Sequence, residues 1–278
     1  MAELRFACRH RPSAADHPEE GKRRFRLTLE YDGTAYSGWQ RQINGPSVQQ
    51  TLEEALLRLT GEYVSVVGSS RTDAGVHALG LCAHFDSGTR IPPEKLAFAL
   101  NTMLPDDVRV RESGLAPEGF HARYSACAKA YRYRFYNARH DRAVGRQFSC
   151  HVPLPLDEAR MHEEAQALLG THDFAAFAAS GSAARSTVRT IYRAQVVRRG
   201  DEVTLTVLGD GFLYNMVRII AGTLMEIGAG KRESGAIEDA IRTHDRLALG
   251  QTAPAKGLTL LAALYAGEEA RAMTFFED

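Results

Sequence analysis

The chain has 278 residues, of which 44% are hydrophobic and 24% charged, as in globular proteins with a large core. No apolar run reaches the about 18 residues of a membrane helix, and the charged start "MAELRFACRHRP" lacks the apolar centre of a signal peptide. These features predict a cytoplasmic protein without a membrane segment. Lysine plus arginine equals aspartate plus glutamate, 34 against 34, so net charge alone does not indicate a polyanionic partner.

Cysteine and histidine spacing predicts no metal site. The four cysteines, Cys8, Cys82, Cys127 and Cys150, form no CxxC pair, and we expect free thiols in a reducing compartment. The ten histidines show neither HxxxH nor HExxH. The glycines of "GAGKRESG" lack the GK[ST] ending of a phosphate-binding loop. The sequence therefore predicts no metal and no small-molecule cofactor.

The first half of the chain alternates strand and helix patterns. Residues 1–22 lack periodicity and are expected to form a loose extension. Ser47 is a plausible N-cap for a helix that ends at Gly61, with leucines at helical spacing between them. The predicted elements are strands at 24–31, 62–68, 79–88 and 107–114, and helices at 47–61 and 92–104.

The second half repeats this mixture of elements. A long alternating strand is predicted over 118–137, and two apolar runs around "RGDE" predict a hairpin over 188–209. A strongly apolar helix, closed by glycines, is predicted over 211–230. The other expected elements are helices at 157–170 and 234–245 and a last strand at 257–265.

These patterns predict an α+β fold with two similar mixed halves, each containing an antiparallel sheet. The expected division is 23–115 for the first half, 118–266 for the second and 267–278 for a tail. A central basic cleft is expected between the halves, because ligand sites favour domain interfaces.

The basic residues are clustered despite the balanced total. From His121 to Arg146 there are seven lysines or arginines and one acid, and from Arg185 to Arg199 five arginines and no acid. Basic patches interleaved with tyrosine and phenylalanine suit a nucleic-acid backbone and its bases. A solvated strand face explains the charge pattern equally well.

The stretch "SSRTDAGVHA", residues 69 to 78, places an acid beside a base in a loop between two apolar strands. An aspartate followed by Ala-Gly is most often a turn former, which is the structural interpretation of Asp73. Arg71 lies two residues away, and a nearby guanidinium keeps a carboxylate ionised at neutral pH. An anionic carboxylate on such a loop can act as a nucleophile or base, as in glycosidic-bond chemistry.

Arg218 is one of two charged residues in the apolar helix "FLYNMVRIIAGTLMEI". A buried, unpaired charge costs several kcal/mol, so Arg218 needs a carboxylate or another anion. One hypothesis is a structural ion pair within its own half. The other is that Arg218 reaches the cleft and pairs with Asp73 or a substrate phosphate.

The strand "KAYRYRFY", residues 129 to 136, places Tyr131, Tyr133 and Phe135 on one face. Strand aromatics usually pack in a core. An aromatic ring that lines a cleft also offers a flat face to a base, which is worth about 1–3 kcal/mol per base. Tyr131 is therefore a candidate for either role.

Seven ordered segments resemble the tRNA pseudouridine synthase A (TruA) family. They are "YDGTAYSGWQRQ", "SSRTDAGVHA", "FHARYSACAKAYRYRFYN", "HDFAAF", "STVRTI", "GFLYNMVRIIAGTLMEIG" and "APAKGLTL". The resemblance spans roughly residues 25 to 266. One departure is that the family more often shows "GAGRTDAG", where this chain has Ser69 and Ser70.

The resemblance implies the pseudouridine synthase fold and an isomerase that converts uridine to pseudouridine on a flipped nucleotide. Asp73 resembles the catalytic aspartate, Tyr131 the tyrosine that stacks on the uracil, and Arg218 the arginine that pairs with the aspartate. Arg71 resembles the arginine that contacts the phosphate of the flipped nucleotide. Expected partners are the tRNA anticodon arm, with positions 38, 39 and 40 as targets, and a second copy of the chain in a homodimer.

Two alternative functions remain open from the residues alone. The basic aromatic strands would also suit a non-catalytic tRNA-binding module or chaperone, which needs no ionised Asp73. A glycosidase or nucleoside hydrolase would use Asp73 but would release free uracil. No second catalytic carboxylate is evident beside Asp73, which disfavours that alternative.

Overall fold

The computed structural model describes residues 4–6, 8, 17–18, 20–179, 181 and 185–277, so most of the expected extension 1–22 lies outside the described residues. The chain forms two compact units. The N-terminal unit comprises Ala7–Cys127 and Leu260–Gly267. The C-terminal unit comprises Met1–Phe6, Ala128–Thr259 and Glu268–Asp278. Each is described in turn.

The N-terminal unit is built on an antiparallel sheet. Strand β1 pairs with β3 on one side and with β4 on the other, and Leu27 lies opposite Ala83 and Ser113. The neighbour of β3 on its far side is β10. The alternating apolar residues of β1 are buried, as the period-two pattern predicts. The strands are β1 (Arg23–Tyr31), β2 (Val67–Gly68), β3 (His77–Ser87), β4 (Val108–Leu115) and β10 (Leu258–Leu264).

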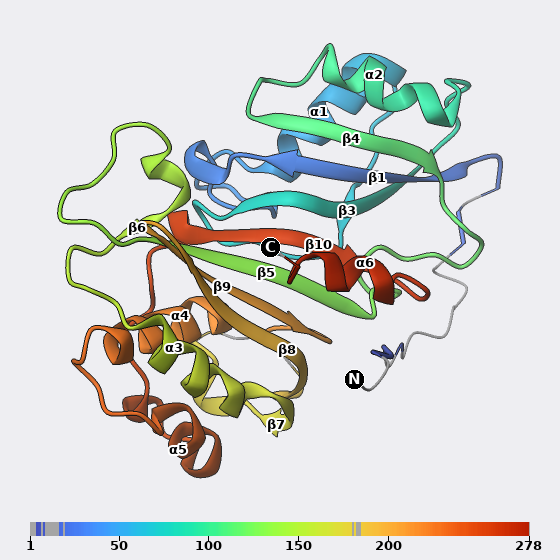
Figure 1. The fold of residues 1–278 in the computed structure, drawn as a ribbon. Helices are drawn as coiled ribbons and strands as arrows, with labels where there is room; N and C mark the ends of the chain where they lie inside the picture. Colours follow the sequence, from blue (N-terminus) through green and yellow to red (C-terminus); the bar gives the residue numbers. More distant parts are fainter. Residues whose placement is uncertain are drawn as a thin grey trace. The chain divides into compact units, whose positions relative to one another are not determined.

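Helices α1 (Val48–Thr60) and α2 (Leu96–Asn101) belong to this unit (Figure 1). The predicted caps of α1 are confirmed: Ser47 accepts a hydrogen bond from the Gln50 amide at 3.3 Å, and Gly61 adopts φ +73°. The strand predicted over 62–68 is wrong except for β2. The Val66 amide donates instead to the Glu53 carboxylate of α1, so a side chain replaces a strand partner.

In the C-terminal unit the strands lie in the order β5, β9, β8 and β7, each antiparallel to its neighbour, and β6 pairs with β5 in parallel. The predicted hairpin is confirmed as β8 and β9, with Arg199 opposite Glu202. The strand predicted over 118–137 begins only at Ala128, and its first ten residues are a turn segment of the N-terminal unit. The strands are β5 (Ala128–Tyr136), β6 (Cys150–His151), β7 (Gly170–Asp173), β8 (Val188–Arg199) and β9 (Glu202–Gly209).

The two faces of the β5–β9–β8 sheet differ. Tyr131, Tyr133 and Phe135 alternate with arginines along β5 and are buried, as predicted. Helices α3 (Glu158–Ala165), α4 (Met216–Gly228) and α5 (Ala236–Thr243) belong to this unit (Figure 1). The long predicted helix 211–230 starts at Met216, because Asn215 adopts a left-handed conformation with φ 60°.

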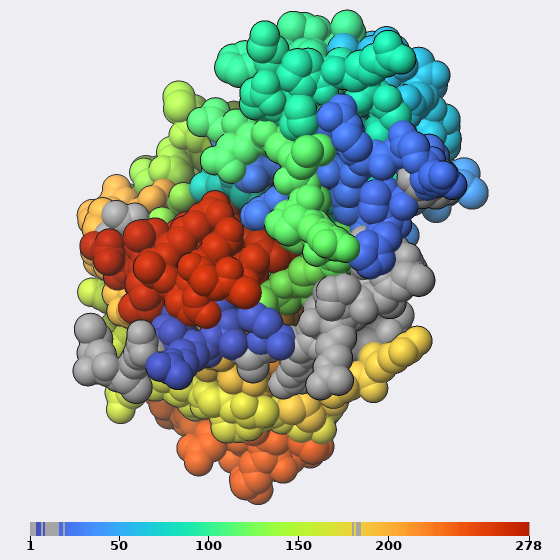
Figure 2. Space-filling model, turned by 90° about the vertical axis from the view of Figure 1, so that its right-hand side faces the viewer, coloured from blue at the N-terminus to red at the C-terminus, as the bar shows by residue number. Residues whose placement is uncertain are grey.

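The arginine face of this sheet is contacted by the C-terminal segment with helix α6 (Glu269–Thr274). Arg132 of β5 donates to the Phe275 carbonyl at 2.7 Å, and the Arg193 guanidinium of β8 lies 4.6 Å from the Phe276 ring centre. The Phe6 amide donates to Glu269 at 3.4 Å, and Figure 2 shows the dark-blue N-terminal residues against the red C-terminal segment.

The predicted mixture of helices and antiparallel sheets is confirmed. The expectation of four free thiols is wrong: Cys8 and Cys127 form a disulfide with Cα atoms 4.6 Å apart, whereas Cys82 and Cys150 are free and buried. The disulfide partners are 119 residues apart in sequence, so spacing could not reveal the pairing. Among the described residues, no helix is both long and apolar enough to span a membrane.

Candidate active site

Asp73 lies in the N-terminal unit, on the loop that joins β2 to β3. Its side chain is partly buried, and that of Arg71 on the same loop is exposed. The Val76 amide donates to the Asp73 carbonyl at 3.1 Å, which closes a turn, and Gly75 within this turn adopts φ +76°. Asp73 therefore sits in the turn that its Ala-Gly sequence predicts. The turn is compatible with a catalytic role of Asp73, because the bond that closes it is a backbone bond.

A glycine from the segment "YDGTAYSGWQ" lies directly against this loop. Gly38 adopts φ +100°, and a Cβ atom at Gly38 would overlap the Thr72 carbonyl oxygen and approach the Asp73 carbonyl carbon to 3.1 Å. Only glycine tolerates both this conformation and this contact. A Cβ atom at Gly33 would likewise overlap the Val76 carbonyl oxygen. The two glycines let this segment pack directly against the aspartate loop.

Hydrogen bonds from the same segment fix the backbone on both sides of Asp73. The Trp39 amide donates to the Thr72 carbonyl at 3.1 Å, and the Gly75 amide donates to the Tyr36 carbonyl at 3.2 Å. The Thr72 hydroxyl lies 2.7 Å from the Tyr31 hydroxyl, in a buried pair. Main-chain hydrogen bonds thus hold the loop on both sides of Asp73.

His77, beside the loop, has a structural role. The Gly33 amide donates to its Nδ1 atom at 3.0 Å, and the ring is 3% exposed. The same Nδ1 atom lies 3.1 Å from Asp32, an ion pair that needs a protonated ring. We favour the neutral ring, because an amide N–H can only donate to an unprotonated nitrogen.

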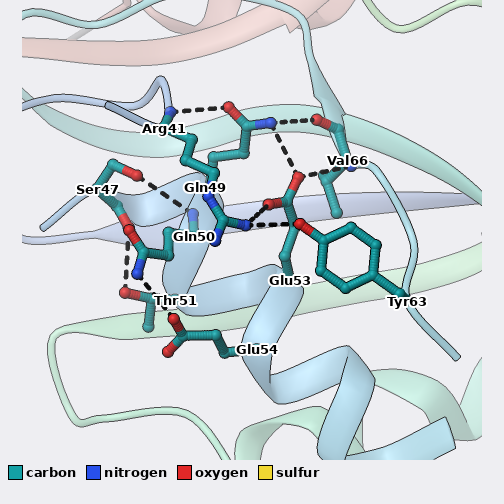
Figure 3. Close-up of polar contacts among 9 residues, drawn as sticks. All are labelled: Arg41, Ser47, Gln49, Gln50, Thr51, Glu53, Glu54, Tyr63 and Val66. Atoms are coloured by element: carbon teal, nitrogen blue, oxygen red, sulfur yellow. Dashed lines mark hydrogen bonds and ion pairs between the residues drawn. The ribbon is translucent and has the colours of Figure 1, made fainter. Parts of the chain in front are cut away.

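The loop that follows Trp39 is anchored to α1 by a buried carboxylate (Figure 3). Glu53 accepts from Arg41 at 3.0 Å, from the Gln49 amide group at 2.9 Å and from the Val66 amide at 3.1 Å. The hydrogen bond to Glu53 raises the pKa of the Arg41 guanidinium. The Trp39 amide binds the Thr72 carbonyl of the aspartate loop. The Glu53 network therefore helps to fix the segment that holds this loop.

Ser70 marks a weak point of the loop. Its side chain is 5% exposed, and its hydroxyl has no hydrogen-bond partner within the part of the chain that the structure describes. A buried hydroxyl without a partner costs about 1–3 kcal/mol. The departure from the family pattern at this position therefore has a measurable cost in stability.

Tyr131 lies in the C-terminal unit, on β5 opposite Val207 of β9. Its side chain is 8% exposed and meets the edge of the Phe212 ring, with ring centres 5.2 Å apart and planes at 82°. Sequence reasoning did not identify Phe212 as the support of Tyr131. The signal was an aromatic residue directly after Gly211.

Arg218 lies in the first turn of α4, and two hydrogen bonds hold its guanidinium. Nε donates to the Ala253 carbonyl at 2.8 Å, and Nη1 donates to the Asn215 side-chain oxygen at 2.8 Å. The positive end of the helix dipole disfavours a cation here, and the first turn of α4 contains no acid. A cation in this position lowers the stability of the helix, but it can bind an anionic ligand.

Tyr133 braces the loop that holds Arg218. Its hydroxyl donates to the Pro254 carbonyl at 2.8 Å, next to Ala253. Burial, followed by the neighbouring Cys150 thiol, raises the pKa of the Tyr133 phenol far above its usual range. Burial likewise raises the pKa of Cys150. Both groups stay neutral, so they act as supports and not as acids or bases at neutral pH.

Asp73 and Arg71 therefore share one loop of the N-terminal unit, and Tyr131 and Arg218 belong to the C-terminal unit. Sequence reasoning did not identify the supports Gly38, Phe212 and Asn215. In the described residues, no group of three or more histidine, cysteine, aspartate or glutamate side chains could hold a metal ion.

Comparison with known proteins places these features in one family. The family model described as tRNA pseudouridine synthase matches residues 28–125 and 165–266. The chain is 50% identical over 244 residues to tRNA pseudouridine synthase A of Ruminiclostridium cellulolyticum, covering 87% of this chain and 100% of that protein. It is 49% identical over 243 residues to the protein of the same name from Acetivibrio thermocellus, covering 87% and 100%. The Bacillus licheniformis protein of that name is 44% identical over 244 residues, covering 87% and 99%.

Proposed function

The chain belongs to the tRNA pseudouridine synthase family, and on this premise we propose that it isomerises uridines in the anticodon stem-loop of tRNA, with Asp73 as the reactive carboxylate. The observation that carries the proposal is that the loop around Asp73 is held by main-chain bonds and close glycine contacts. These contacts fix the position of Asp73 within the turn.

The reaction breaks the bond from C1′ to N1 of uracil and forms a bond from C1′ to C5. N1 gains a proton and C5 loses one, so no electron pair or group leaves the substrate. Asp73 attacks or assists as an ionised carboxylate, and the guanidinium of Arg71 favours that ionised form. The base must first leave its stack, which costs a few kcal/mol.

The other candidate residues act on the flipped nucleotide. Tyr131 stacks on the uracil, and the ring edge of Phe212 keeps the Tyr131 ring in place. Arg218 supplies a cation for the carboxylate of Asp73 or for a phosphate, and Arg71 contacts the phosphate of the target nucleotide.

The test of the proposal is Asp73→Asn, with Asp106→Asn as a matched control. Asp106 is exposed and pairs with Arg109 on its own loop, far in sequence from the site. We expect Asp73→Asn to lower the rate of pseudouridine formation by about 10⁴-fold or more, because the nucleophile is lost, and tRNA binding to persist. The Asp106→Asn variant should match the wild type. Turnover of Asp73→Asn near the wild-type rate would falsify the role of this carboxylate.

The same assay separates the alternative functions. A hydrolase would release free uracil, whereas the isomerase keeps the base attached to the ribose. A binding module or chaperone would form no pseudouridine and would be indifferent to Asp73. Pseudouridine mapping on total tRNA, with and without the protein, identifies the positions that are modified.

The role of the Tyr131 hydroxyl is tested by two substitutions. Tyr131→Phe keeps the ring and should bind tRNA as the wild type does, whereas Tyr131→Ala should weaken binding by the about 1–3 kcal/mol of a base stack. A large loss of turnover in Tyr131→Phe, at unchanged binding, would assign proton transfer to the hydroxyl. Equal binding by both variants would contradict stacking.

We also propose that two copies of the chain form a homodimer and that one tRNA contacts both. The support for this assembly is the family membership. The molar mass of the free protein in sedimentation, and the stoichiometry of the tRNA complex, test it. A monomer that binds one tRNA with full activity would contradict the proposal.

A further inference from the structure

A short turn segment of the N-terminal unit, residues 120–125, displays an aromatic side chain to solvent on a rigid base. Ala122 at its centre is fully buried and is held from both sides. Its amide donates to His84 Nδ1 at 3.1 Å, and its carbonyl accepts from the Tyr265 hydroxyl at 2.8 Å. The backbone on either side of Ala122 therefore has little freedom to move.

His121 connects this rigid backbone to the Tyr124 ring. Its Nδ1 atom lies 3.1 Å from the amides of both Arg123 and Tyr124 and accepts from them, which orients the imidazole. The imidazole stacks on the Tyr124 ring, with ring centres 4.2 Å apart and planes at 24°. The turn is closed by the Ser125 amide, which donates to the His121 carbonyl at 2.9 Å.

Tyr124 is nevertheless 58% exposed, although nearby aromatic residues of the same unit are covered. Phe120 and Tyr265 are 6% and 7% exposed, and the Arg26 guanidinium lies over both rings at 5.4 and 4.6 Å. The rings of Phe120 and Tyr265 are therefore packed together with the Arg26 guanidinium. The Arg123 guanidinium also lies near a ring, 5.9 Å from the centre of Tyr124, but Arg123 is itself exposed.

An exposed ring that is oriented by a stacked partner and flanked by a cation has the features of a nucleic-acid stacking site. A flat π-face accepts any base, and the neighbouring guanidinium suits a phosphate. A paired base inside a duplex already has both faces stacked, so such a ring selects an unpaired nucleotide.

We propose that Tyr124, supported by His121 and flanked by Arg123, is a binding site for an unpaired nucleotide of the RNA substrate. The base stacks on the exposed part of the Tyr124 ring, and Arg123 contacts the phosphate. The inference rests on the proposed function, which supplies an RNA as substrate, and adds a second contact point besides Asp73 and Tyr131.

The experiment compares Tyr124→Ala, Tyr124→Phe and Tyr124→Trp, with Phe98→Ala as the control. Phe98 is 78% exposed on α2 of the same unit. We expect Tyr124→Ala to raise the Kd for tRNA by about 5- to 150-fold, the equivalent of one base stack. Tyr124→Phe, Tyr124→Trp and Phe98→Ala should bind within about 3-fold of the wild type, because a stack needs a ring and not a hydroxyl.

Fluorescence keeps the test valid if Tyr124→Ala fails to fold. The only tryptophan of the natural chain, Trp39, is 3% exposed, so Tyr124→Trp adds an exposed reporter. Saturable quenching of this reporter by tRNA is the expected result. Wild-type Kd in a folded Tyr124→Ala variant, or no quenching in Tyr124→Trp, would overturn the inference.

The two proposals fail differently. If the wild type forms no pseudouridine in tRNA, the proposed function fails, whatever the effect of Tyr124 on binding. If pseudouridine forms but binding is indifferent to the ring at position 124, only the second binding site fails.

Discussion

The two units hold their candidate residues in different ways. In the N-terminal unit, the loop of Asp73 is held by main-chain bonds to Trp39 and Tyr36 and by the close contact of Gly38. In the C-terminal unit, Arg218 is held through its own guanidinium, by Asn215 and the Ala253 carbonyl. The loop of Asp73 is thus positioned by backbone contacts, whereas Arg218 is positioned by hydrogen bonds of its side chain.

This difference follows from the chemistry of the two groups. A nucleophilic carboxylate needs its oxygens for the reaction, so the support must come from the backbone. A guanidinium has five N–H donors, so hydrogen bonds can orient it while it keeps the charge that an anion needs. Substitutions in the two units should therefore separate stability from turnover.

The largest expected effect is that of Gly38→Ala in the N-terminal unit. The new Cβ atom meets the Thr72 carbonyl at a backbone conformation that side chains rarely adopt. We expect a loss of about 3 kcal/mol or more in the free energy of unfolding, from backbone strain and overpacking together. Turnover should fall as well, because the Asp73 turn must shift. Chemical denaturation and pseudouridine formation measure the two effects.

Gly61→Ala is the matched control for Gly38→Ala. Gly61 also has a positive φ, of +73°, but nothing lies within 4 Å of a Cβ atom at this position. Gly61→Ala therefore introduces backbone strain but no steric overlap. It should leave the turnover of the folded enzyme unchanged. Equal losses of turnover in both variants would show that Gly38 matters only for backbone strain.

A smaller effect, confined to turnover, is expected for Asn215→Gly in the C-terminal unit. Glycine adopts the left-handed conformation of Asn215 at no steric cost but cannot accept from Arg218. We expect kcat to fall by about 10- to 100-fold through misplacement of the guanidinium. Thermal unfolding should change little, and Asn215→Asp should restore the acceptor.

His244→Gly is the control for the backbone part of this change. His244 is the other non-glycine residue with a positive φ, of 57°, among the described residues, and it ends α5. It should leave kcat at the wild-type value. An unchanged kcat in Asn215→Gly would mean that the Asn215 side chain is not needed to position Arg218.

The smallest expected effect is a gain in stability from Ser70→Ala. The substitution removes a buried hydroxyl for which the described residues supply no partner. We expect the free energy of unfolding to rise by about 1 kcal/mol, with turnover unchanged. A decrease in stability would indicate that the hydroxyl has a partner that the structure does not describe.

Local patterns of the sequence were sufficient for several features. Ser47 and Gly61 mark the ends of α1, the alternation along β5 identifies the buried Tyr131, and "RGDE" identifies the β8–β9 turn. The turn at Asp73 follows from the glycine two residues later. Capping, turns and strand alternation depend on neighbours within a few residues, so the sequence contains them directly.

Other features depended on tertiary structure. Residues 260–267 join the N-terminal unit although they follow the C-terminal unit in the chain, and β10 lies next to β3. Residues 62–66 form no strand, since Glu53 takes the Val66 amide, and Cys8 pairs with Cys127. Phe212 and Asn215 likewise acquire their roles only from the partners that the fold brings to them. Contacts between distant segments are selected by burial and hydrogen bonding of the whole chain, and no local pattern encodes them.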